Sequence, residues 1–411
     1  MRILIIGGGG REHAIAWRLK QSPDVTEVIA SPGNPGLAKL GRCIRTPVSV
    51  AGFADLAQAE RVNLTVVGPE APLVAGVVDE FRSRGLRIVG PTQAAARLEG
   101  SKIFAKQFFA RAAIPTARSV ETSSTTEALD LIKRFTLPIV IKADGLAAGK
   151  GVIIAQTTDE ARRAVETLGP HLVIEEFLEG EEVSFIGISN GKEVLPLEAS
   201  QDHKRVSDGD AGPNTGGMGA YCDGRILTPT QAGIVMDRVM NPAVAQMAAE
   251  GMPFTGFLYA GLMMTSSGPK VLEFNVRLGD PETQALMHRL EGGFVEALQF
   301  AAGGPRSGLR WRHDPSVCVV LAAQGYPDKP RAGDPITGIE QAETGGAIVF
   351  QAGTKLAGDR LVTAGGRVLG VTASGGTLRT AIENAYSAAE KINFDGMHFR
   401  RDIGARGLSR W

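Results

Sequence analysis

Residues 138–155 read PIVIKADGLAAGKGVIIA, and this stretch does most to decide the fold. Two runs rich in β-branched residues are joined by a loop with three glycines, so we expect a β-hairpin with a glycine-rich turn. Its bare amides and two lysines favour a lid over a polyphosphate, and an ordinary exposed turn is the alternative. A Walker loop is excluded, because Gly145 lies only three residues before Gly149. In addition, Lys150 is followed by Gly151 and a strand instead of Ser or Thr and a helix.

Composition bounds the class of protein. A chain of 411 residues is long enough for two to four domains with ample cores. Lys plus Arg equals Asp plus Glu at 44 each, which argues against nucleic acid or an anionic membrane as a partner. No apolar run is long enough to span a membrane and no signal-peptide pattern occurs, so we expect a cytoplasmic enzyme. The three cysteines and six histidines lack zinc-ligand spacing, which leaves a divalent ion on oxygen ligands possible.

The pattern along the chain predicts three units. Residues 1–100 alternate helical stretches, one starting at Arg11 and one at Ala71, with the short strands RILIIG, TEVIA, LTVVG and RIVG. This rhythm indicates an α/β domain with a Rossmann-like parallel sheet. Residues 101–312 change to an α+β pattern with long strands. After the stretch GGPRSGLRW, residues 313–411 read as short strands and one helix from Thr377, which predicts a small mixed domain.

A run of four glycines, GGGGREHA at residues 7–14, follows the first strand and opens a helix. Free amides at a helix start can bind a phosphate, so Gly9 and Gly10 are candidate ligands. The dinucleotide fingerprint is not met, because its third glycine falls on Glu12 or His13. We therefore expect a single phosphate and no NAD, with a tight structural turn as the alternative.

Carboxylates follow two of the expected strands. Glu70, in the sequence GPE, lies at the carboxyl end of LTVV, where open α/β sheets place ligands. It could accept from a sugar hydroxyl or an amine, or it could simply support the following helix. The acidic run EEFLEGEE at residues 175–182 lies between two strands. It suits a hinge beside a nucleotide, although a solvated acidic face is the simpler interpretation.

Two further segments carry polar groups that need a reason. The loop from Gln201 to Gly219 is long, polar and glycine-rich, which favours a functional loop over a disordered one. In EFNVR, the residues Glu273, Asn275 and Arg277 alternate along a strand and therefore share one face. A carboxylate and an amide oxygen suit Mg²⁺, and a neighbouring guanidinium suits an anion. An exposed sheet face is the alternative.

Taken together, these motifs resemble the phosphoribosylamine–glycine ligase family of the ATP-grasp superfamily. The resemblance covers essentially the whole chain and rests on GGGGREHA, GPE, KADGLAAGKG, EEFLEGEE, QDHKR…GPNTGGMGAY, LEFNVRLGDPET and RRDIG. It implies an N-terminal domain over 1–100, a two-part ATP-grasp unit over 101–312 and a C-terminal domain over 313–411. Within the ATP-grasp unit, a lid subdomain with the glycine-rich loop is expected over about 118–190.

The same resemblance implies roles for individual residues. Lys102 and Lys142 would hold ATP phosphates under the lid, Glu182 would bind ribose, Glu273 and Asn275 would bind Mg²⁺ or Mn²⁺, and Arg277 would act in catalysis with Lys142. The other ATP-binding candidates are Gly145, Gly149, Lys150, Gly151, Glu175, Glu176, Phe177 and Leu178. Substrate-binding candidates are Gly9, Gly10, Glu70, Asp202, Lys204, Asp208, Asn214, Thr215, Gly216, Arg277 and Asp280. Many ATP-grasp enzymes add a metal carboxylate on the preceding strand, where this chain has apolar FLYAGLMM.

The implied reaction joins glycine to 5-phosphoribosylamine with ATP, through glycyl phosphate, in purine biosynthesis. The expected partners are these small molecules, with no nucleic acid or membrane, and the chain is expected to be a monomer or weak homodimer. An ATP-grasp carboxylase or formyltransferase of a ribonucleotide would share the ATP residues. A nicotinamide oxidoreductase and a non-catalytic nucleotide-binding module are the remaining alternatives.

Overall fold

A computed structural model describes residues 1–46, 48–147 and 151–410. The first unit is a parallel sheet of five strands in the order β3-β2-β1-β4-β5. Its strands are β1 (Arg2–Gly7), β2 (Glu27–Pro32), β3 (Arg42–Cys43), β4 (Leu64–Val67) and β5 (Ile88–Val89). Alternate residues of β1 enter two different cores, Ile3 and Ile5 on one face and Leu4 and Ile6 on the other. This is the two-residue period of a strand buried on both faces.

Six helices surround this sheet: α1 (Gly10–Leu19), α2 (Pro35–Leu40), α3 (Val50–Ala59), α4 (Glu70–Val74), α5 (Val77–Ser83) and α6 (Gln93–Gly100). The single helix expected from Ala71 is in fact two, because the chain turns at Gly76 with a positive φ of 88°. Only glycine adopts that backbone readily, so the residue type itself marks the break.

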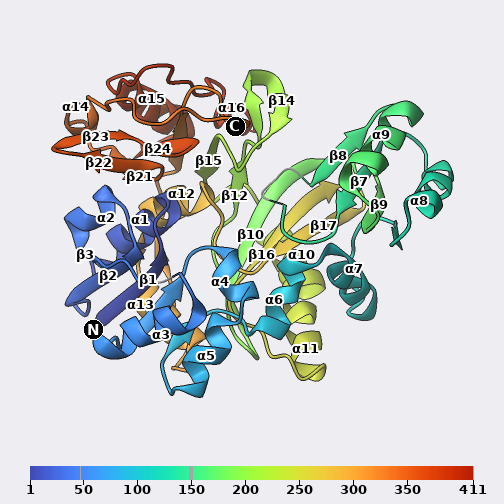
Figure 1. Ribbon diagram of the computed structural model, residues 1–411, viewed down its shortest axis with the longest axis horizontal. Helices are drawn as coiled ribbons and strands as arrows, with labels where there is room; N and C mark the ends of the chain where they lie inside the picture. Colours follow the sequence, from blue (N-terminus) through green and yellow to red (C-terminus); the bar gives the residue numbers. More distant parts are fainter. Residues whose placement is uncertain (47, 148–150, 411) are drawn as a thin grey trace.

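The segment expected to form the lid subdomain, here called the lid, contains an antiparallel sheet of four strands in the order β6-β9-β7-β8, with its own small apolar core. The last part of the expected range, residues 181–190, belongs to the large sheet instead. The elements of the lid are β6 (Ser119–Thr122), α8 (Thr125–Leu131), η1 (Ile132–Arg134), β7 (Ile139–Ala143), β8 (Val152–Ala155), α9 (Thr158–Leu168) and β9 (Leu172–Glu176). As predicted, β7 and β8 form a hairpin, in which Lys142 pairs with Val152 across the glycine-rich loop. Figure 1 shows these strands on the side of the molecule away from the N-terminal sheet.

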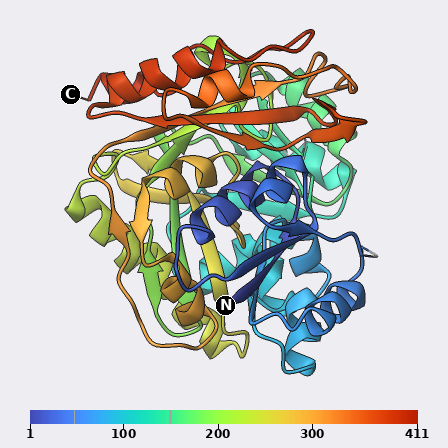
Figure 2. The same cartoon turned by 90° about the vertical axis from the view of Figure 1, so that its left-hand side faces the viewer.

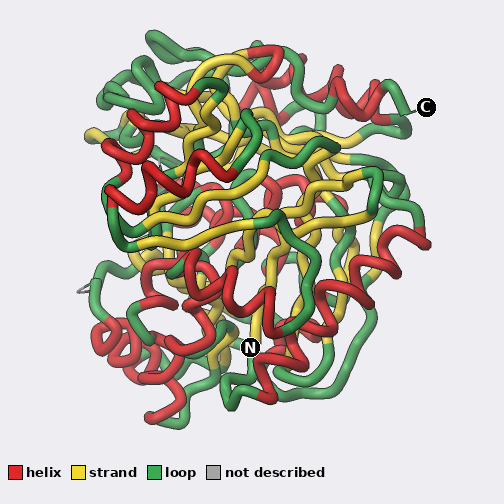
Figure 3. Tube along the Cα trace, turned by 90° about the vertical axis from the view of Figure 1, so that its right-hand side faces the viewer, coloured by secondary structure: helices red, strands yellow, loops and turns green. Residues whose placement is uncertain are grey.

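The largest sheet is antiparallel and runs β17-β16-β10-β12-β15-β20-β24-β21, with β11 paired to β10. Its strands are β10 (Glu181–Asn190), β11 (Val194–Pro196), β12 (Ser200–Asp202), β15 (Gly219–Cys222), β16 (Thr255–Thr265), β17 (Gly268–Asn275), β20 (Ser316–Ala322), β21 (Ile348–Gln351) and β24 (Arg367–Ser374). The sequence places a domain boundary near residue 312, yet the sheet crosses that point through the pairing of β15 with β20. The strands run through the middle of the molecule with helices around them (Figure 3).

The helices of this part are α7 (Lys102–Arg111), α10 (Pro229–Val235), η3 (Met236–Met240), α11 (Asn241–Ala249), α12 (Glu282–Arg289), α13 (Phe294–Ala301), α14 (Ile339–Glu343), α15 (Leu378–Ala389) and α16 (Ala405–Leu408). Three two-stranded pairs lie outside the sheet among the described residues. Two are hairpins: β13 (Arg205–Ser207) with β14 (Ala211–Asn214), joined by η2 (Asp208–Asp210), and β22 (Thr354–Ala357) with β23 (Arg360–Thr363). The third pairs β18 (Leu290–Gly292) with β19 (Arg310–Trp311), on either side of α13. Figure 2 shows the C-terminal strands and helices as a layer across the molecule, next to the N-terminal unit.

Candidate active site

A cavity of about 780 Å³ opens where the lid, the large sheet and the two terminal units meet. It gathers predicted site residues from across the chain. They are Glu70, Lys102, Lys142, Gly145, Gly151, Glu175, Glu176, Phe177, Leu178, Glu182, Asp202, Lys204, Asn214, Thr215, Gly216, Glu273, Asn275, Arg277 and Asp280. Gly149 and Lys150, also predicted, lie outside the described residues.

Three predicted residues, Gly9, Gly10 and Asp208, do not line this cavity. The backbone N–H of Gly9 donates to Glu12 Oε2 at 2.5 Å. The carboxylate of Asp280 accepts the backbone N–H of Arg11, so protein carboxylates already occupy the start of α1. The amides of Gly9 and Arg11 are thus partnered by carboxylates in this conformation, and a phosphate at the N-terminal glycine turn stays a prediction. The carboxylate of Asp208 is exposed and instead accepts the backbone N–H of Arg401 at 2.8 Å.

Lys142, on β7, reaches the cavity as one of two lysines on a single carboxylate. Its Nζ lies 3.0 Å from Glu175 Oε2 and donates to the carbonyl of Leu272 at 3.0 Å. The Nζ of Lys106, on α7, lies 3.0 Å from Glu175 Oε1. Burial lowers the pKa of Lys106, and the charge of Glu175 opposes that effect. Glu175, itself only 2% exposed, therefore holds both ammonium groups in place at the end of β9.

Lys102 lies one helical turn before Lys106, so both side chains leave α7 on the same face. Its Nζ donates to the carbonyl of Gly145 in the lid loop at 2.8 Å. In the same loop, the carboxylate of Asp144 accepts from the hydroxyl of Ser101 at 3.0 Å and from the backbone N–H of Ile103 at 3.1 Å. Lys102 and both of its neighbours in the chain, Ser101 and Ile103, thus hydrogen-bond to the glycine-rich loop.

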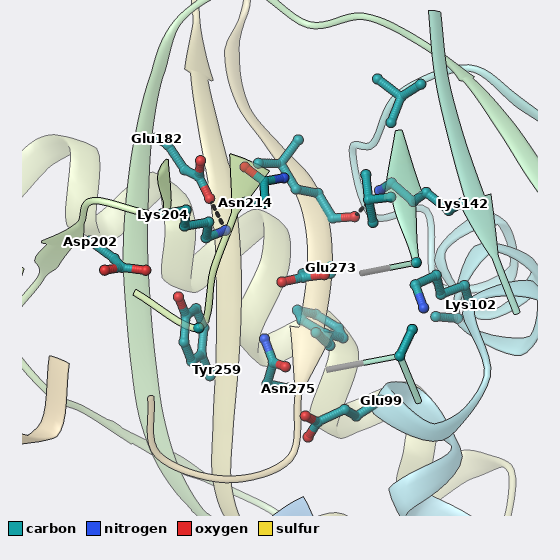
Figure 4. Close-up of a pocket in the computed structure, with 18 of the residues that line it drawn as sticks. Glu99, Lys102, Lys142, Glu182, Asp202, Lys204, Asn214, Tyr259, Glu273 and Asn275 are labelled. Atoms are coloured by element: carbon teal, nitrogen blue, oxygen red, sulfur yellow. Dashed lines mark hydrogen bonds and ion pairs between the residues drawn. The ribbon is translucent and has the colours of Figure 1, made fainter. Parts of the chain in front are cut away.

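The predicted metal ligands lie between two groups of cations. Figure 4 shows Glu273 and Asn275 at the centre, Lys204 with Glu182 on one side, and Lys142 and Lys102 on the other. Burial would raise the pKa of Glu273, but the positive charges of Lys204, Lys142 and Lys102 outweigh it and lower the pKa. Glu273 is therefore an ionised carboxylate that accepts no hydrogen bond from a side chain among the described residues, and a metal ligand must be ionised in this way.

Within the described part of the chain, no group of three or more His, Cys, Asp or Glu side chains could hold a metal. A site built from one carboxylate and one amide oxygen fits Mg²⁺, which keeps waters and takes phosphate oxygens for its other positions. On the preceding strand, β16, the residue opposite Asn275 is Tyr259, which lines the cavity. A tyrosine therefore lies where many ATP-grasp enzymes would place a metal carboxylate.

Arg277 is held by carboxylates from the N-terminal unit. Its Nη2 lies 2.9 Å from Glu99 of α6, and its Nε lies 3.3 Å from Glu70 of α4. Nη2 also donates to Asn275 Oδ1 at 3.2 Å. Burial alone would lower the pKa of Arg277, but Glu99 and Glu70 together raise it. Glu99 was not predicted from the sequence, because nothing in its own segment distinguishes it from a helix-surface glutamate.

A second polar cluster lies at the start of α12. Glu282 Oε1 accepts from the hydroxyl of Tyr259 at 2.7 Å and from that of Ser184 at 3.1 Å. Burial and the nearby charge of Glu282 raise the pKa of Asp202 well above its ordinary value. The ammonium group of Lys204 contacts Glu182, and its positive charge partly offsets the rise in the pKa of Asp202.

The C-terminal unit adds cavity residues that the sequence did not single out, among them Arg367 and Tyr326. Arg367 donates to the carbonyl of Asp280 at 2.5 Å and lies 3.5 Å from its carboxylate. The hydroxyl of Tyr326 accepts the backbone N–H of Gly216 at 3.1 Å. Both line the cavity, although each belongs to a segment with no recognisable motif of its own.

Family models match nearly all of this chain. They are the N domain of phosphoribosylglycinamide synthetase over residues 1–99, its ATP-grasp (A) domain over 100–283 and its C domain over 316–406. The chain belongs to the phosphoribosylglycinamide synthetase family. This membership confirms the predicted ATP-grasp fold and the enzyme class, an ATP-dependent ligase of purine biosynthesis.

Individual relatives agree with the family match. The phosphoribosylamine–glycine ligases of Ralstonia nicotianae and Xanthomonas axonopodis are 49% and 51% identical to this chain. The first alignment covers 100% of both chains, and the second covers 100% of this chain and 99% of the relative. The crystal structure of the enzyme from Thermotoga maritima is 36% identical, with a TM-score of 0.86, and covers 98% of this chain and 100% of its own. Among the described residues, no helix is long and apolar enough to cross a membrane.

Proposed function

We propose that the cavity joins glycine to 5-phosphoribosylamine through glycyl phosphate, giving glycinamide ribonucleotide, ADP and phosphate. ATP-dependent ligation follows from family membership. The observation that carries the proposed intermediate is the convergence of Lys102, Lys142, Lys204 and Arg277 on Glu273 in one cavity beneath a glycine-rich hairpin. Such a set of fixed cations can neutralise a phosphoryl group and its acceptor carboxylate together.

ATP would lie between the lid and β17. Lys102 and Lys142 would contact its phosphates, and the chain from Glu175 to Leu178 would lie beside adenine. Glu182 would accept from the ribose hydroxyls. Support comes from the positions of these groups, which all line the cavity, and from the hydrogen bond between Lys102 and the lid loop. ATP-grasp enzymes use ATP with divalent ions, and Mg²⁺ or Mn²⁺ would bind to Glu273 and Asn275, where it would neutralise phosphate charge.

Phosphorylation activates the amino acid. Glycine's carboxylate is a poor electrophile, because hydroxide is a poor leaving group, whereas phosphate is a good one. The carboxylate would attack the γ-phosphoryl group, with Arg277 beside the charge that builds up and Lys142 on the phosphate oxygens. The nitrogen of the ribosylamine would then attack the acyl carbon and expel phosphate. A closed lid would keep water from the acyl phosphate in between.

The ribosylamine would occupy the wall formed by residues 202–216 and Asp280 together with the N-terminal and C-terminal units. Several predicted substrate residues line that wall: Glu70, Asp202, Lys204, Asn214, Thr215, Gly216 and Asp280. The guanidinium groups of Arg11, Arg205, Arg367 and Arg406 line it too, so an anionic sugar phosphate would meet positive charge there.

Oxygen-18 tests the intermediate. Glycine labelled in its carboxylate would pass one labelled oxygen to each phosphate released, because the bridging oxygen leaves with the phosphoryl group. We expect singly labelled phosphate by mass spectrometry, and omission of glycine should stop its release. Unlabelled phosphate from an active enzyme would refute the acyl phosphate. A carboxylase would require bicarbonate instead, and an oxidoreductase or a nucleotide-binding module would release no glycine-dependent phosphate.

A further inference from the structure

Arg400, in the C-terminal segment RRDIG, is the largest of the fully buried side chains, and every part of its guanidinium has a partner. Its Nε and Nη2 donate to the two carboxylate oxygens of Asp402, each at 2.7 Å. Nη1 donates to the carbonyl of Arg205 and to Asp210 Oδ1, each at 3.0 Å. Burial would raise the pKa of Asp402, but its hydrogen bonds to Arg400 lower it to about 2. The pair is therefore fully ionised at neutral pH.

The two groups reached by Nη1 belong to the hairpin formed by β13, η2 and β14, at residues 205–214. Residues 207–213 are all exposed, so this hairpin has no apolar core of its own. An isolated two-stranded hairpin of this kind is marginally stable in water. Its position depends on the C-terminal segment, because the backbone N–H of Arg401 donates to Asp208, that of Gly209 donates to Asp402 at 2.9 Å, and Arg406 contacts Asp210.

The tip of the hairpin has an uncommon backbone conformation. Asp210 has a φ of 55°, in the left-handed region that residues with a side chain adopt at a steric cost, although aspartate does so more readily than most. Its carboxylate is held by both Arg400 and Arg406. Strain of this kind persists only where surrounding contacts impose it, and here those contacts come from residues 400–406.

The same hairpin forms part of the cavity wall. Arg205, Asp210 and Asn214 line the cavity, together with Arg406 of α16. Figure 1 shows β14 and α16 beside each other and away from the lid strands β7–β9 that carry Lys142. A shift of the hairpin would therefore change the guanidinium-rich wall and leave the ATP lysines where they are.

We propose that Arg400 is a positioning residue for the second, phosphate-bearing substrate. It does not line the cavity itself. It fixes the hairpin at residues 205–214 so that Arg205 and Asn214 face an anionic ribosylamine, while Asp402 keeps Arg400 itself in place. This inference rests on the proposed function, and it gives the pair of buried Arg400 and half-buried Asp402 a role in the cavity that neither residue lines.

Arg400→Lys tests the proposal, because lysine keeps the charge but cannot bridge Asp402 and also reach the hairpin. We expect KM for 5-phosphoribosylamine to rise about tenfold, the usual scale for one charge-assisted hydrogen bond, with KM for ATP unchanged. Asp208→Ala should shift KM in the same direction by a smaller factor. Asp208 is exposed and outside the cavity, so this second variant keeps the test valid should the lysine variant misfold.

Arg401→Ala is the matched control. The Arg401 side chain is 66% exposed and pairs with Glu390 on the surface, while only its backbone N–H holds the hairpin. Its KM values should equal those of the wild type. Equal increases in KM for ATP and for the ribosylamine, or an unchanged ribosylamine KM in a folded Arg400→Lys enzyme, would overturn the positioning role. A wild-type enzyme without glycine-dependent phosphate release would refute the proposed function instead.

Discussion

Lys142 owes its position to a carboxylate that it shares with another lysine. Glu175 lies between Lys142 and Lys106, at 3.0 Å from each, and is almost fully buried. An ion pair that is shielded from water holds a side chain in one geometry, which a surface lysine does not achieve. The cavity thus presents an ammonium group in a fixed position, and preorganised charge of this kind would lower the barrier of the proposed phosphoryl transfer.

Replacement of Lys142 by alanine should slow phosphate release by about two orders of magnitude, which is the usual effect of losing one preorganised charge at a developing anion. It should also lower the affinity for ATP. Steady-state kinetics with varied ATP would measure both effects. Lys133→Ala is the control, since Lys133 is 63% exposed and pairs only with Asp130. Turnover within threefold of wild type in Lys142→Ala would show that cations other than Lys142 bind the ATP phosphates.

Glu273 should matter for the metal far more than for the fold. Its carboxylate stays ionised because the charges of three lysines act on it, so Glu273→Gln removes the proposed metal ligand with little change of shape. We expect turnover at saturating Mg²⁺ to fall about a hundredfold, while the urea midpoint stays near that of wild type. A variant that recovers full activity at high Mg²⁺ would show that the metal ligands lie elsewhere.

The glycine-rich hairpin shows which elements a sequence predicts well. The runs Ile139–Ala143 and Val152–Ala155 contain β-branched residues bounded by glycine, and the strands form there. Short elements with no pattern, such as α2, β3 and the hairpin of β22 and β23, were not predicted. Their positions depend on packing against residues that are distant in the sequence, and local sequence patterns carry no information about such contacts.

Two glycines of the lid subdomain offer a matched test of the lid. Gly145 has a φ of 90° and Gly169 a φ of 87°, and neither has any atom within 4 Å of an added Cβ. Alanine at either site should therefore destabilise the protein by about 1–2 kcal/mol through its backbone alone. Only Gly145 lies on the cavity and accepts from Lys102, so only Gly145→Ala should raise KM for ATP, by about tenfold. Equal KM changes in both variants would show that the effect is not local to the loop.

The same limit applies to the candidate site. Residues within a compact motif, such as Glu273, Asn275 and Arg277, could be found because their spacing places them on one strand face. Glu99 and Arg367 could not, because each reaches the cavity from a separate unit through contacts that only the fold creates. Residues that enter the site only through pairing with a motif residue, as Glu99 does with Arg277, therefore could not be predicted from a single sequence.

At the scale of the whole molecule, buried histidines link stability to pH. His288 of α12 stacks on Trp17 with ring centroids 5.8 Å apart, and its Nδ1 has no hydrogen-bond partner among the described residues. Burial lowers the pKa of His288 to about 4, below the ordinary 6.5. The folded state therefore favours the neutral ring. Its contribution to stability is complete above about pH 6.5 and is lost as the pH falls toward 4.

Phenylalanine in place of His288 should keep the stacked ring and remove this titration. We expect the unfolding free energy at pH 7 to stay the same or rise, since an unpaired buried nitrogen is lost. Between about pH 6.5 and 4.5, its dependence on pH should flatten by about 1.4 kcal/mol per pH unit relative to wild type. Urea unfolding of both proteins at several pH values would measure this difference, and parallel curves would mean that His288 already carries a proton when folded.

The large sheet also constrains how the chain can be made. β15 gains its outer partner only when Ser316–Ala322 has left the ribosome, long after β10, β12 and β16 have been synthesised. Until then the backbone groups of β15 form an open edge that another nascent chain can pair with. The C-terminal unit closes that edge with β20 and extends the sheet by β24 and β21. The C-terminal unit therefore completes the sheet of the middle of the molecule, although it is translated last.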